Sequence, residues 1–198
     1  MGSSALAVWE DERAKRIDEL MEAHRTVGGS DRGRRWKTQQ LNWSMILRLA
    51  SELQGYARDL HDLAVAEFVN GLASGFPAAE SAIGTQLSNK RLLDSGNAQP
   101  GSLGNDFARF GLQLWPALRA HDSRAAGWNT DLEALNKARN AIAHDDVLKL
   151  QELKVDGYNL NNLTTFRAFR RSMNFLVPAL DTVVADHLAA VYRKGKPW

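Results

Sequence analysis

Apolar residues recur at alternating intervals of three and four along two long stretches of the chain. In the stretch from about residue 36 to 70, this series is Ile46, Leu49, Leu53, Tyr56, Leu60 and Leu63. In the C-terminal stretch it is Phe166, Phe169, Met173, Leu176, Leu180, Val183, His187 and Val191. Such spacing places the apolar side chains on one face of an α-helix, so each stretch predicts one long amphipathic helix.

Glycine and proline mark the expected ends of these helices. Gly71, Gly75 and Pro77 end the first one after Asn70. Pro178 lies inside the second, where it predicts a kink about one turn upstream rather than an end. A third amphipathic helix opens the chain, with Leu6, Trp9, Ile17, Leu20, Met21 and His24. Shorter helices are expected over 79–94 and 105–119, on either side of a polar loop at 95–102.

No alternating β-branched stretch, internal repeat or low-complexity tract interrupts this helical pattern. The sequence therefore predicts one all-α domain over residues 1–198, an elongated helical bundle with two long helices and shorter ones between them. Helices of roughly 30 residues are ~45 Å long, which is more than a globule of this size needs. Long apolar stripes on such helices favour a homodimer.

Composition narrows the chemistry of the chain. The 198 residues include no cysteine, which excludes disulfides, a thiolate zinc site and a thiol nucleophile. Lys and Arg number 25 against 23 Asp and Glu, so binding to nucleic acid would need local patches. The first residues carry no leading positive charge, and no apolar run approaches the ~18 residues that span a bilayer. We therefore expect a cytoplasmic protein without membrane contact.

One helix carries polar side chains beside an apolar face. Residues 129–133 predict its start, because a capping residue is followed by acids in the first turn. The apolar face that follows consists of Leu132, Leu135, Ala138 and Ile142. At ~100° per residue, Arg139 projects between Leu132 and Leu135. Arg139 is therefore expected on the apolar side of its own helix.

A guanidinium in that position needs a partner, because an unpaired charge in a dry core costs several kcal/mol. One interpretation is a buried ion pair, for which Glu52 of the long helix is a candidate. The other is that Arg139 faces a cleft in which an anion binds. The sequence alone leaves both interpretations open.

A polar stripe beside Arg139 consists of Asn136, Asn140 and His144. Their spacing of four stacks them on one side of the helix. His144 is expected in the last turn, since Asp145 and Asp146 would be unfavourable at the negative end of the helix dipole. A histidine at this position is a candidate general acid or base. Asp145 or Asp146 is expected to cap a short helix at 147–153 rather than to bind a metal.

These residues resemble a known family. The segment Arg139-Asn140-Ala141-Ile142-Ala143-His144 looks like the signature of the HEPN superfamily of helical nucleotide- and RNA-binding domains. That signature is an arginine, a polar residue that is often Asn, a few further residues and a histidine. In the family a long helix with an aromatic or acidic patch precedes the motif helix, much as residues 49–56 do here. The resemblance covers residues 36–191, and its specific part is the six-residue motif.

The resemblance implies a metal-independent endoribonuclease without a cofactor, of toxin or defence type. RNA would be its substrate, and an antitoxin protein would be a candidate partner. The family's two-fold homodimer places both copies of Arg139 and His144 in one cleft. By this resemblance His144 handles the proton of the 2′-hydroxyl or of the leaving 5′-oxygen, and Arg139 stabilises the charge on the phosphate. Asn140 would orient one of them or contact the phosphate.

Helix geometry sets a condition on this resemblance. Residues five apart, such as Arg139 and His144, project ~140° apart on an intact helix. Both can therefore reach one phosphate only where the helix end unwinds or where a second protomer supplies one of them.

Other polar residues are candidates for RNA contacts, with a solvated surface as the alternative in each case. They are Arg32, Arg34, Arg35 and Lys37 with Trp36 before the long helix, and Arg167, Arg170 and Arg171 on the polar side of the last one. The metal-like run at 59–62, which includes His61, is interpreted as surface because its polar members point in different directions. His187 lies in an apolar stripe and is interpreted as a core histidine.

Three hypotheses about function follow from the sequence. The first is a ribonuclease that uses Arg139, Asn140 and His144. The second is a non-catalytic helical module whose Arg139 and His144 hold a nucleotide or RNA, or stabilise a dimer. The third is a structural interaction protein in which Arg139 forms an ion pair.

Overall fold

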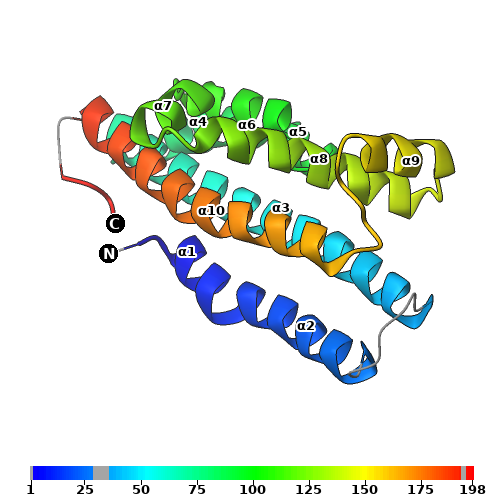
Figure 1. Ribbon diagram of the computed structural model, residues 1–198. Helices are drawn as coiled ribbons and strands as arrows, with labels where there is room; N and C mark the ends of the chain where they lie inside the picture. Colours follow the sequence, from blue (N-terminus) through cyan, green and yellow to red (C-terminus); the bar gives the residue numbers. More distant parts are fainter. Residues whose placement is uncertain (1, 29–35, 193–194) are drawn as a thin grey trace.

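The computed structural model describes residues 2–28, 36–192 and 195–198, and of Trp36 and Lys37 only the backbone. All regular secondary structure in these residues is helical, as predicted (Figure 1). The elements are α1 (Ser4–Val8), the π-helical turn η1 (Trp9–Arg13), α2 (Ala14–Gly28), α3 (Trp36–Ala73), α4 (Pro77–Ser88), α5 (Leu92–Ser95), α6 (Pro100–Phe107), the 3-10 turn η2 (Ala108–Phe110), α7 (Leu114–His121), α8 (Ala125–Ala143), α9 (Val147–Val155) and α10 (Leu163–Tyr192).

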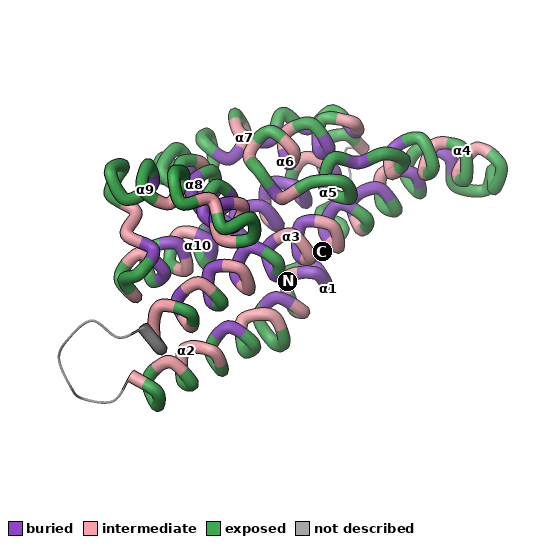
Figure 2. Tube along the Cα trace, turned by 90° about the vertical axis from the view of Figure 1, so that its right-hand side faces the viewer, coloured by how far each residue is buried: buried purple, intermediate pink, exposed green. Residues whose placement is uncertain are grey.

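The two long helices, α3 and α10, lie side by side and form the centre of an elongated bundle (Figure 1). Helix α2 packs against α3, and α8 packs against both long helices. Fully buried side chains where these helices meet include Leu49, Tyr56, Leu60, Phe166 and Phe169. Figure 2 shows buried positions along the inner faces and exposed positions on the outside. The predicted apolar stripes therefore form the core and their helical period is confirmed, except at Val191, which is 42% exposed near the end of α10.

Helix α10 continues through Pro178, as expected from the apolar pattern on both sides of it. Proline has no N–H, so it cannot donate to the carbonyl one turn earlier in the helix. The hydroxyl of Tyr56 in α3 donates to the carbonyl of Val177 next to the proline, at 2.8 Å. Burial raises the pKa of Tyr56 well above its usual value, so the hydroxyl stays protonated and keeps α3 joined to this turn of α10.

Of the described helices, α10 has the length and composition that a membrane span requires, with a mean hydropathy of 1.4 over 18 residues. Half of that window is buried inside the bundle, and core helices of soluble proteins pass the same test. The helix also contains Asp181, which is 3% exposed and accepts hydrogen bonds from the backbone N–H (3.1 Å) and the hydroxyl of Ser3. In this structure α10 packs within the bundle, and its Asp181 binds Ser3 of the N-terminal segment.

The N-terminal helical segment contains a π-helical turn, η1, between α1 and α2. Arg13 ends this turn and lies across α3 at Gly55, where an added Cβ would come within 2.3 Å of the guanidinium. From there Arg13 donates to Glu52 at 2.8 Å and to Asp59 at 2.7 Å. Gly55 therefore makes room for a guanidinium that bridges two carboxylates of α3.

The predicted helix at 79–94 is two helices, because the chain leaves α4 at Asn89 and turns through Lys90 with a φ of 53°. The next helix, α5, is capped from a distance. The carboxylate of Asp106 accepts the backbone N–H groups of Leu92 (3.0 Å) and Leu93 (2.8 Å). A buried acid elsewhere in the chain thus starts a helix that the local sequence does not mark.

The predicted helix at 105–119 is also interrupted. Gly111 adopts a φ of 89° after η2, and α7 starts three residues later. Glycine adopts this left-handed conformation without strain, and it commonly ends helices. The ring of His187 donates from Nε2 to the carbonyl of Phe110 at this end, at 3.0 Å. Its interpretation as a satisfied histidine is confirmed, but the residue is half-buried and lies at the edge of the core.

Candidate functional site

Helix α8 carries the segment that resembles the HEPN signature. It begins at Ala125, four residues before the predicted start, because Ala125 and Trp128 are buried and extend the packed face. The predicted core positions Leu132, Leu135 and Ala138 are fully buried. Arg139 lies on this side of the helix and is itself half-buried, as its projection predicts.

The guanidinium of Arg139 bonds to its neighbour rather than to an acid. Its Nη1 donates to Oδ1 of Asn140 at 3.0 Å, and no acidic partner lies within ion-pair distance in the described parts of the chain. The candidate partner Glu52 is bound instead by three arginines of the N-terminal half: Arg13 at 2.8 Å, Arg16 at 3.4 Å and Arg48 at 2.6 Å. The hypothesis of an Arg139–Glu52 ion pair is therefore wrong, because Glu52 faces α2.

Asn140 has a second partner that the sequence did not suggest. The Nδ2 of Asn97 donates to the same oxygen, Oδ1 of Asn140, at 2.6 Å. Asn97 lies in the short segment between α5 and α6, 43 residues earlier in the chain. No motif or spacing links the two asparagines, so only the packing of the loop on α8 identifies this contact.

Side chains of α3 and α8 hold the loop on both sides of Asn97. Nε2 of Gln54 in α3 donates to the carbonyl of Gly96 at 2.6 Å. Nδ2 of Asn136 in α8 donates to the carbonyl of Ala98 at 3.0 Å, and Ala98 is 1% exposed. The predicted polar stripe on α8 thus has a structural member, Asn136, which supports the loop.

His144 lies at the point where α8 unwinds. The helix ends at Ala143, and His144 has φ −108° and ψ 7°. Its imidazole is exposed and forms no hydrogen bond with Arg139 or Asn140. Asp145 follows in a left-handed conformation with φ 50°. The carboxylate of Asp146 accepts the N–H of Lys149 at 3.1 Å and caps α9, which confirms the predicted cap.

Comparison of this chain with family models, with curated proteins and with solved structures found no match. No family is therefore assigned by them. The resemblance to the HEPN signature rests on residues 139–144 of the sequence.

Next to His144, α9 presents an apolar face to solvent. Val147 is 57% exposed, Leu148 is 72% exposed and Val155 is 87% exposed. At ~100° per residue these three positions project within about one quadrant of the helix. Figure 2 shows α9 as mostly exposed, at the end of the molecule opposite α4. Exposed apolar side chains on one helix face are typical of surfaces that associate with another protein.

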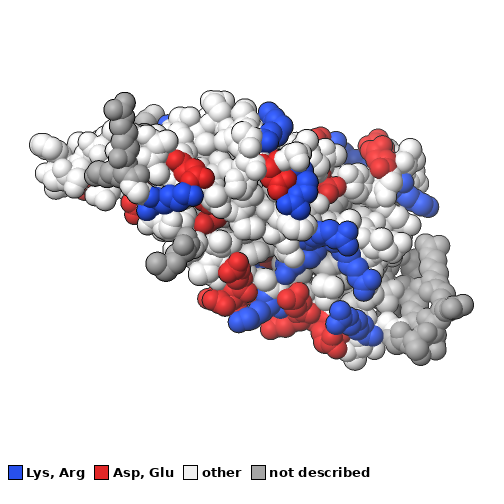
Figure 3. Space-filling model, turned by 60° about the vertical axis from the view of Figure 1, so that its left-hand side comes forward, with Lys and Arg blue, Asp and Glu red and all other residues white. Residues whose placement is uncertain are grey.

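The predicted RNA contacts divide into several groups. Arg167 and Arg171 are exposed on α10. Arg34 and Arg35, like Arg32, lie outside the described residues, and of Lys37 only the backbone is described. On the face drawn in Figure 3, basic and acidic side chains are interspersed. On this face, backbone contacts with RNA would come from individual arginines.

Arg170 differs from its two neighbours in the sequence, because only 11% of its side chain is exposed. Its guanidinium lies 5.8 Å from the ring centre of Trp9, with Nη2 at 3.4 Å from the carbonyl of Ala14 and 3.6 Å from Asp18. Nη1 is buried without a hydrogen-bond partner. Burial lowers the pKa of Arg170. The predicted RNA contact of Arg170 has little exposed surface available.

We expect Arg170→Met to keep the protein folded, with a stability that is unchanged or higher by about 1 kcal/mol, because it removes a poorly paired buried charge and keeps the contact with Trp9. RNA affinity should not change. Arg171→Ala, on the exposed side, should weaken RNA binding. The number of counterions released on binding, obtained from the salt dependence of the affinity, should fall by about one. Urea denaturation and anisotropy titrations at several salt concentrations measure both. Equal losses of affinity in the two variants would contradict this placement.

His61 is fully buried, so its interpretation as a surface residue is wrong. Its Nε2 lies 3.1 Å from the carbonyl oxygen of Asp106, and its Nδ1 lies 3.2 Å from Nη1 of Arg91. Burial lowers the pKa of His61, which fits a neutral ring that donates from Nε2 and accepts at Nδ1. Helices α5 and α6 cover this side of α3. Within the described residues, no group of three or more His, Cys, Asp or Glu could hold a metal ion.

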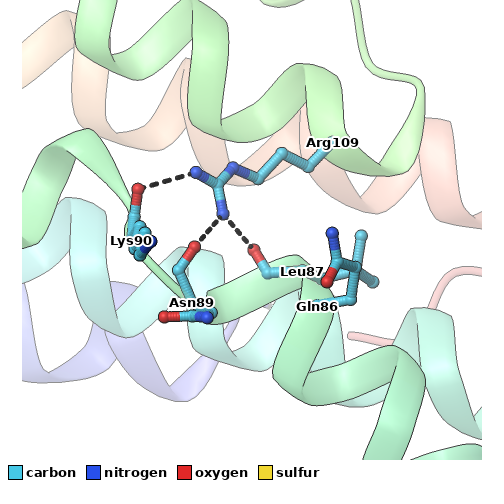
Figure 4. Close-up of a pocket in the computed structure, with 5 residues that line it drawn as sticks. All are labelled: Gln86, Leu87, Asn89, Lys90 and Arg109. Carbon is cyan, nitrogen blue, oxygen red and sulfur yellow. Dashed lines mark hydrogen bonds between the residues drawn. The ribbon is translucent and has the colours of Figure 1, made fainter.

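A surface cavity of about 490 Å³ lies elsewhere (Figure 4). Its lining consists of Gln86, Leu87, Asn89, Lys90 and Arg109. The guanidinium of Arg109 donates to the carbonyls of Leu87 (3.1 Å), Asn89 (2.7 Å) and Lys90 (2.8 Å). Carbonyls at a helix end lack helical donors, so Arg109 caps α4. Both terminal nitrogens of Arg109 are used in this way, and its Nε lies 3.6 Å from Oδ1 of Asp106.

Proposed function

We propose that this chain is a metal-independent endoribonuclease of the HEPN type, a toxin or defence nuclease that acts as a homodimer. Arg139, Asn140 and His144 form its active site. His144 transfers the proton of the 2′-hydroxyl or of the leaving 5′-oxygen. Arg139 stabilises the charge that builds on the phosphate, and Asn140 orients Arg139.

The observation that carries the proposal is the environment of Arg139. The guanidinium lies on the buried side of α8, bonds to the neutral amide of Asn140 and is paired with no acid in the described residues. An arginine placed in this way has N–H groups available for an anionic ligand. Paired with a carboxylate, as Arg13 is with Glu52, it would be used for stability instead.

The chemistry of RNA makes these residue types sufficient. RNA carries its own nucleophile, the 2′-hydroxyl, next to each phosphate. An imidazole that moves a proton and a guanidinium that neutralises developing charge are then enough for transesterification. No cofactor is required for this step.

A second protomer meets the condition that helix geometry imposes. Arg139 and His144 project ~140° apart on a helix, and the α8 end unwinds only at His144. The exposed Val147, Leu148 and Val155 of α9 offer an apolar contact surface next to His144. A two-fold dimer through this end of the molecule pairs Arg139 of one protomer with His144 of its partner.

Purified protein should cleave single-stranded RNA in the presence of excess EDTA. The products should end in a 2′,3′-cyclic phosphate, because the 2′-hydroxyl is the nucleophile. Gel analysis of end-labelled RNA and mass spectrometry of the products provide the measurement. Cleavage that stops on chelation and returns with magnesium, or products with a 3′-hydroxyl, would contradict the mechanism. RNA binding without any cleavage would favour a non-catalytic nucleotide- or RNA-binding module.

A further inference from the structure

The loop between α5 and α6 delivers one side chain to the proposed active site. Nδ2 of Asn97 lies 2.6 Å from Oδ1 of Asn140, the same oxygen that accepts Nη1 of Arg139 at 3.0 Å. One amide oxygen thus receives two donors, one from the loop and one from the arginine. The three side chains form a short hydrogen-bonded chain from a fixed loop to a guanidinium.

The loop is well placed to set the orientation of an amide. The residues on either side of Asn97 have their carbonyls bound, Gly96 by Gln54 of α3 and Ala98 by Asn136 of α8. Gln54 also binds the carbonyl of Leu93 at 2.9 Å. A loop held at both neighbours of one residue presents that residue's side chain in a fixed position.

We propose that Asn97 is a positioning residue, which fixes the Asn140 amide with its oxygen toward Arg139 and thereby sets the guanidinium for a phosphate. A side-chain amide has an oxygen that accepts and an NH₂ that donates, and rotation by ~180° exchanges them. The NH₂ of Asn97 selects the orientation in which Asn140 accepts. In the other orientation two donors, the Asn140 NH₂ and the Arg139 Nη1, would face each other. The inference rests on the proposed function for its consequence in cleavage.

Asn97→Asp is the sharpest test, because a carboxylate only accepts. The Asn140 amide must then rotate to donate to Asp, and its oxygen no longer faces Arg139. We expect kcat for RNA cleavage to fall about 100-fold with KM within about two-fold of the wild type, as displacement of a catalytic group by about 1 Å does. Asn97→Ala, which removes the donor without adding a charge, should lower kcat about 10-fold.

Two controls separate positioning from folding. Gln99→Ala changes an exposed residue two positions later in the same loop and should leave kcat, KM and the melting temperature unchanged. In an Asn140→Ala background, Asn97→Ala should have no further effect on kcat, since the two residues then act through the same contact. Full additivity of the two substitutions would overturn the inference, and so would wild-type kcat in folded Asn97→Asp.

A measurement without RNA tests the inference independently of the proposed function. The side-chain NH₂ resonances of Asn140, assigned by NMR, should shift in Asn97→Asp and Asn97→Ala and stay in place in Gln99→Ala. If the wild-type protein cleaves no RNA, the proposed function fails, while the shifts still decide whether Asn97 orients Asn140. Unchanged Asn140 resonances in both Asn97 variants would overturn the inference even in an active enzyme.

Discussion

Arg139→Ala is expected to reduce RNA cleavage at least about 100-fold, because it removes the guanidinium that stabilises charge on the phosphate. Arg139→Lys should restore little activity, since an ammonium cannot bind a phosphate in the bidentate way. Its single nitrogen also does not occupy the place of the guanidinium beside Asn140. His144→Ala should lose activity to a similar degree, because the proton transfer then lacks its imidazole. Single-turnover cleavage of a fluorescent RNA gives the rates.

The fold offers matched controls for both residues. Arg119 and His121 are exposed on α7, in the same last turn. Arg119→Ala and His121→Ala remove the same side chains and should cleave RNA at the wild-type rate. All four variants should elute as dimers with unchanged melting temperatures. A folded, dimeric Arg139→Ala that cleaves RNA normally would rule out the proposed active site.

Mixing the two inactive variants tests whether one site uses both subunits. In a heterodimer of Arg139→Ala with His144→Ala, one site retains the arginine of one protomer and the histidine of its partner. Such a composite site should recover part of the wild-type rate after the subunits exchange. A site made by a single protomer would recover nothing, because each protomer lacks one residue.

Glu52→Gln is expected to destabilise the protein by about 3 kcal/mol, because three arginines then face a neutral amide. Glu52 is 4% exposed, and its partners Arg13, Arg16 and Arg48 are 16%, 43% and 41% exposed. Because the arginines are partly exposed to water, the expected loss of stability is at the lower end of the range for a broken buried ion pair. For a chain of this length the melting temperature should fall by about 10 °C.

The loss of stability in Glu52→Gln should become smaller as the pH falls. Burial alone would raise the pKa of Glu52, but hydrogen bonds from Arg13 and Arg16 and the charge of Arg48 hold it below its usual value. A carboxyl of this kind stabilises the fold above its unfolded pKa of about 4.3, and the stabilisation disappears as the pH falls through the folded pKa. Urea denaturation should give the full difference at neutral pH and a smaller one below about pH 4.

Glu22→Gln is the matched control for this experiment. Glu22 pairs with Arg25 at 3.2 Å, and both side chains are more than half exposed. An exposed pair of this kind contributes less than about 1 kcal/mol. A loss of stability in Glu52→Gln as small as in Glu22→Gln, or one that does not change between neutral and acidic pH, would contradict the predicted role of Glu52.

The helical pattern predicted the parts of the fold in which local and tertiary preferences agree. Each residue of the apolar series from Ile46 to Leu63 is buried or half-buried. Helix α3 extends only three residues beyond its predicted end. The breaks at Lys90 and Gly111 were missed. At these points distant residues decide the backbone: Asp106 caps α5, and Arg109 holds the carbonyls at the end of α4. Spacing along the chain contains no information about such contacts.

The candidate site was predicted only in part, for the same reason. Projection on a helical wheel places Arg139 on the buried side, and the dipole argument places His144 at the helix end. The partner suggested for Arg139 was wrong, because Glu52 is bound by Arg13 of η1, Arg16 of α2 and Arg48 of α3 itself. Asn97 was not predicted at all, since an isolated asparagine in a loop carries no local signal.

The absence of a side chain at Gly55 of α3 allows an arginine of the N-terminal segment to reach two carboxylates of that helix. A glycine inside a helix costs about 1 kcal/mol relative to alanine. Here its missing side chain leaves the space in which Arg13 crosses the helix to reach Glu52 and Asp59. In homologous sequences we therefore expect these positions to evolve together: a lineage that gains a side chain at position 55 should also lose the arginine at position 13.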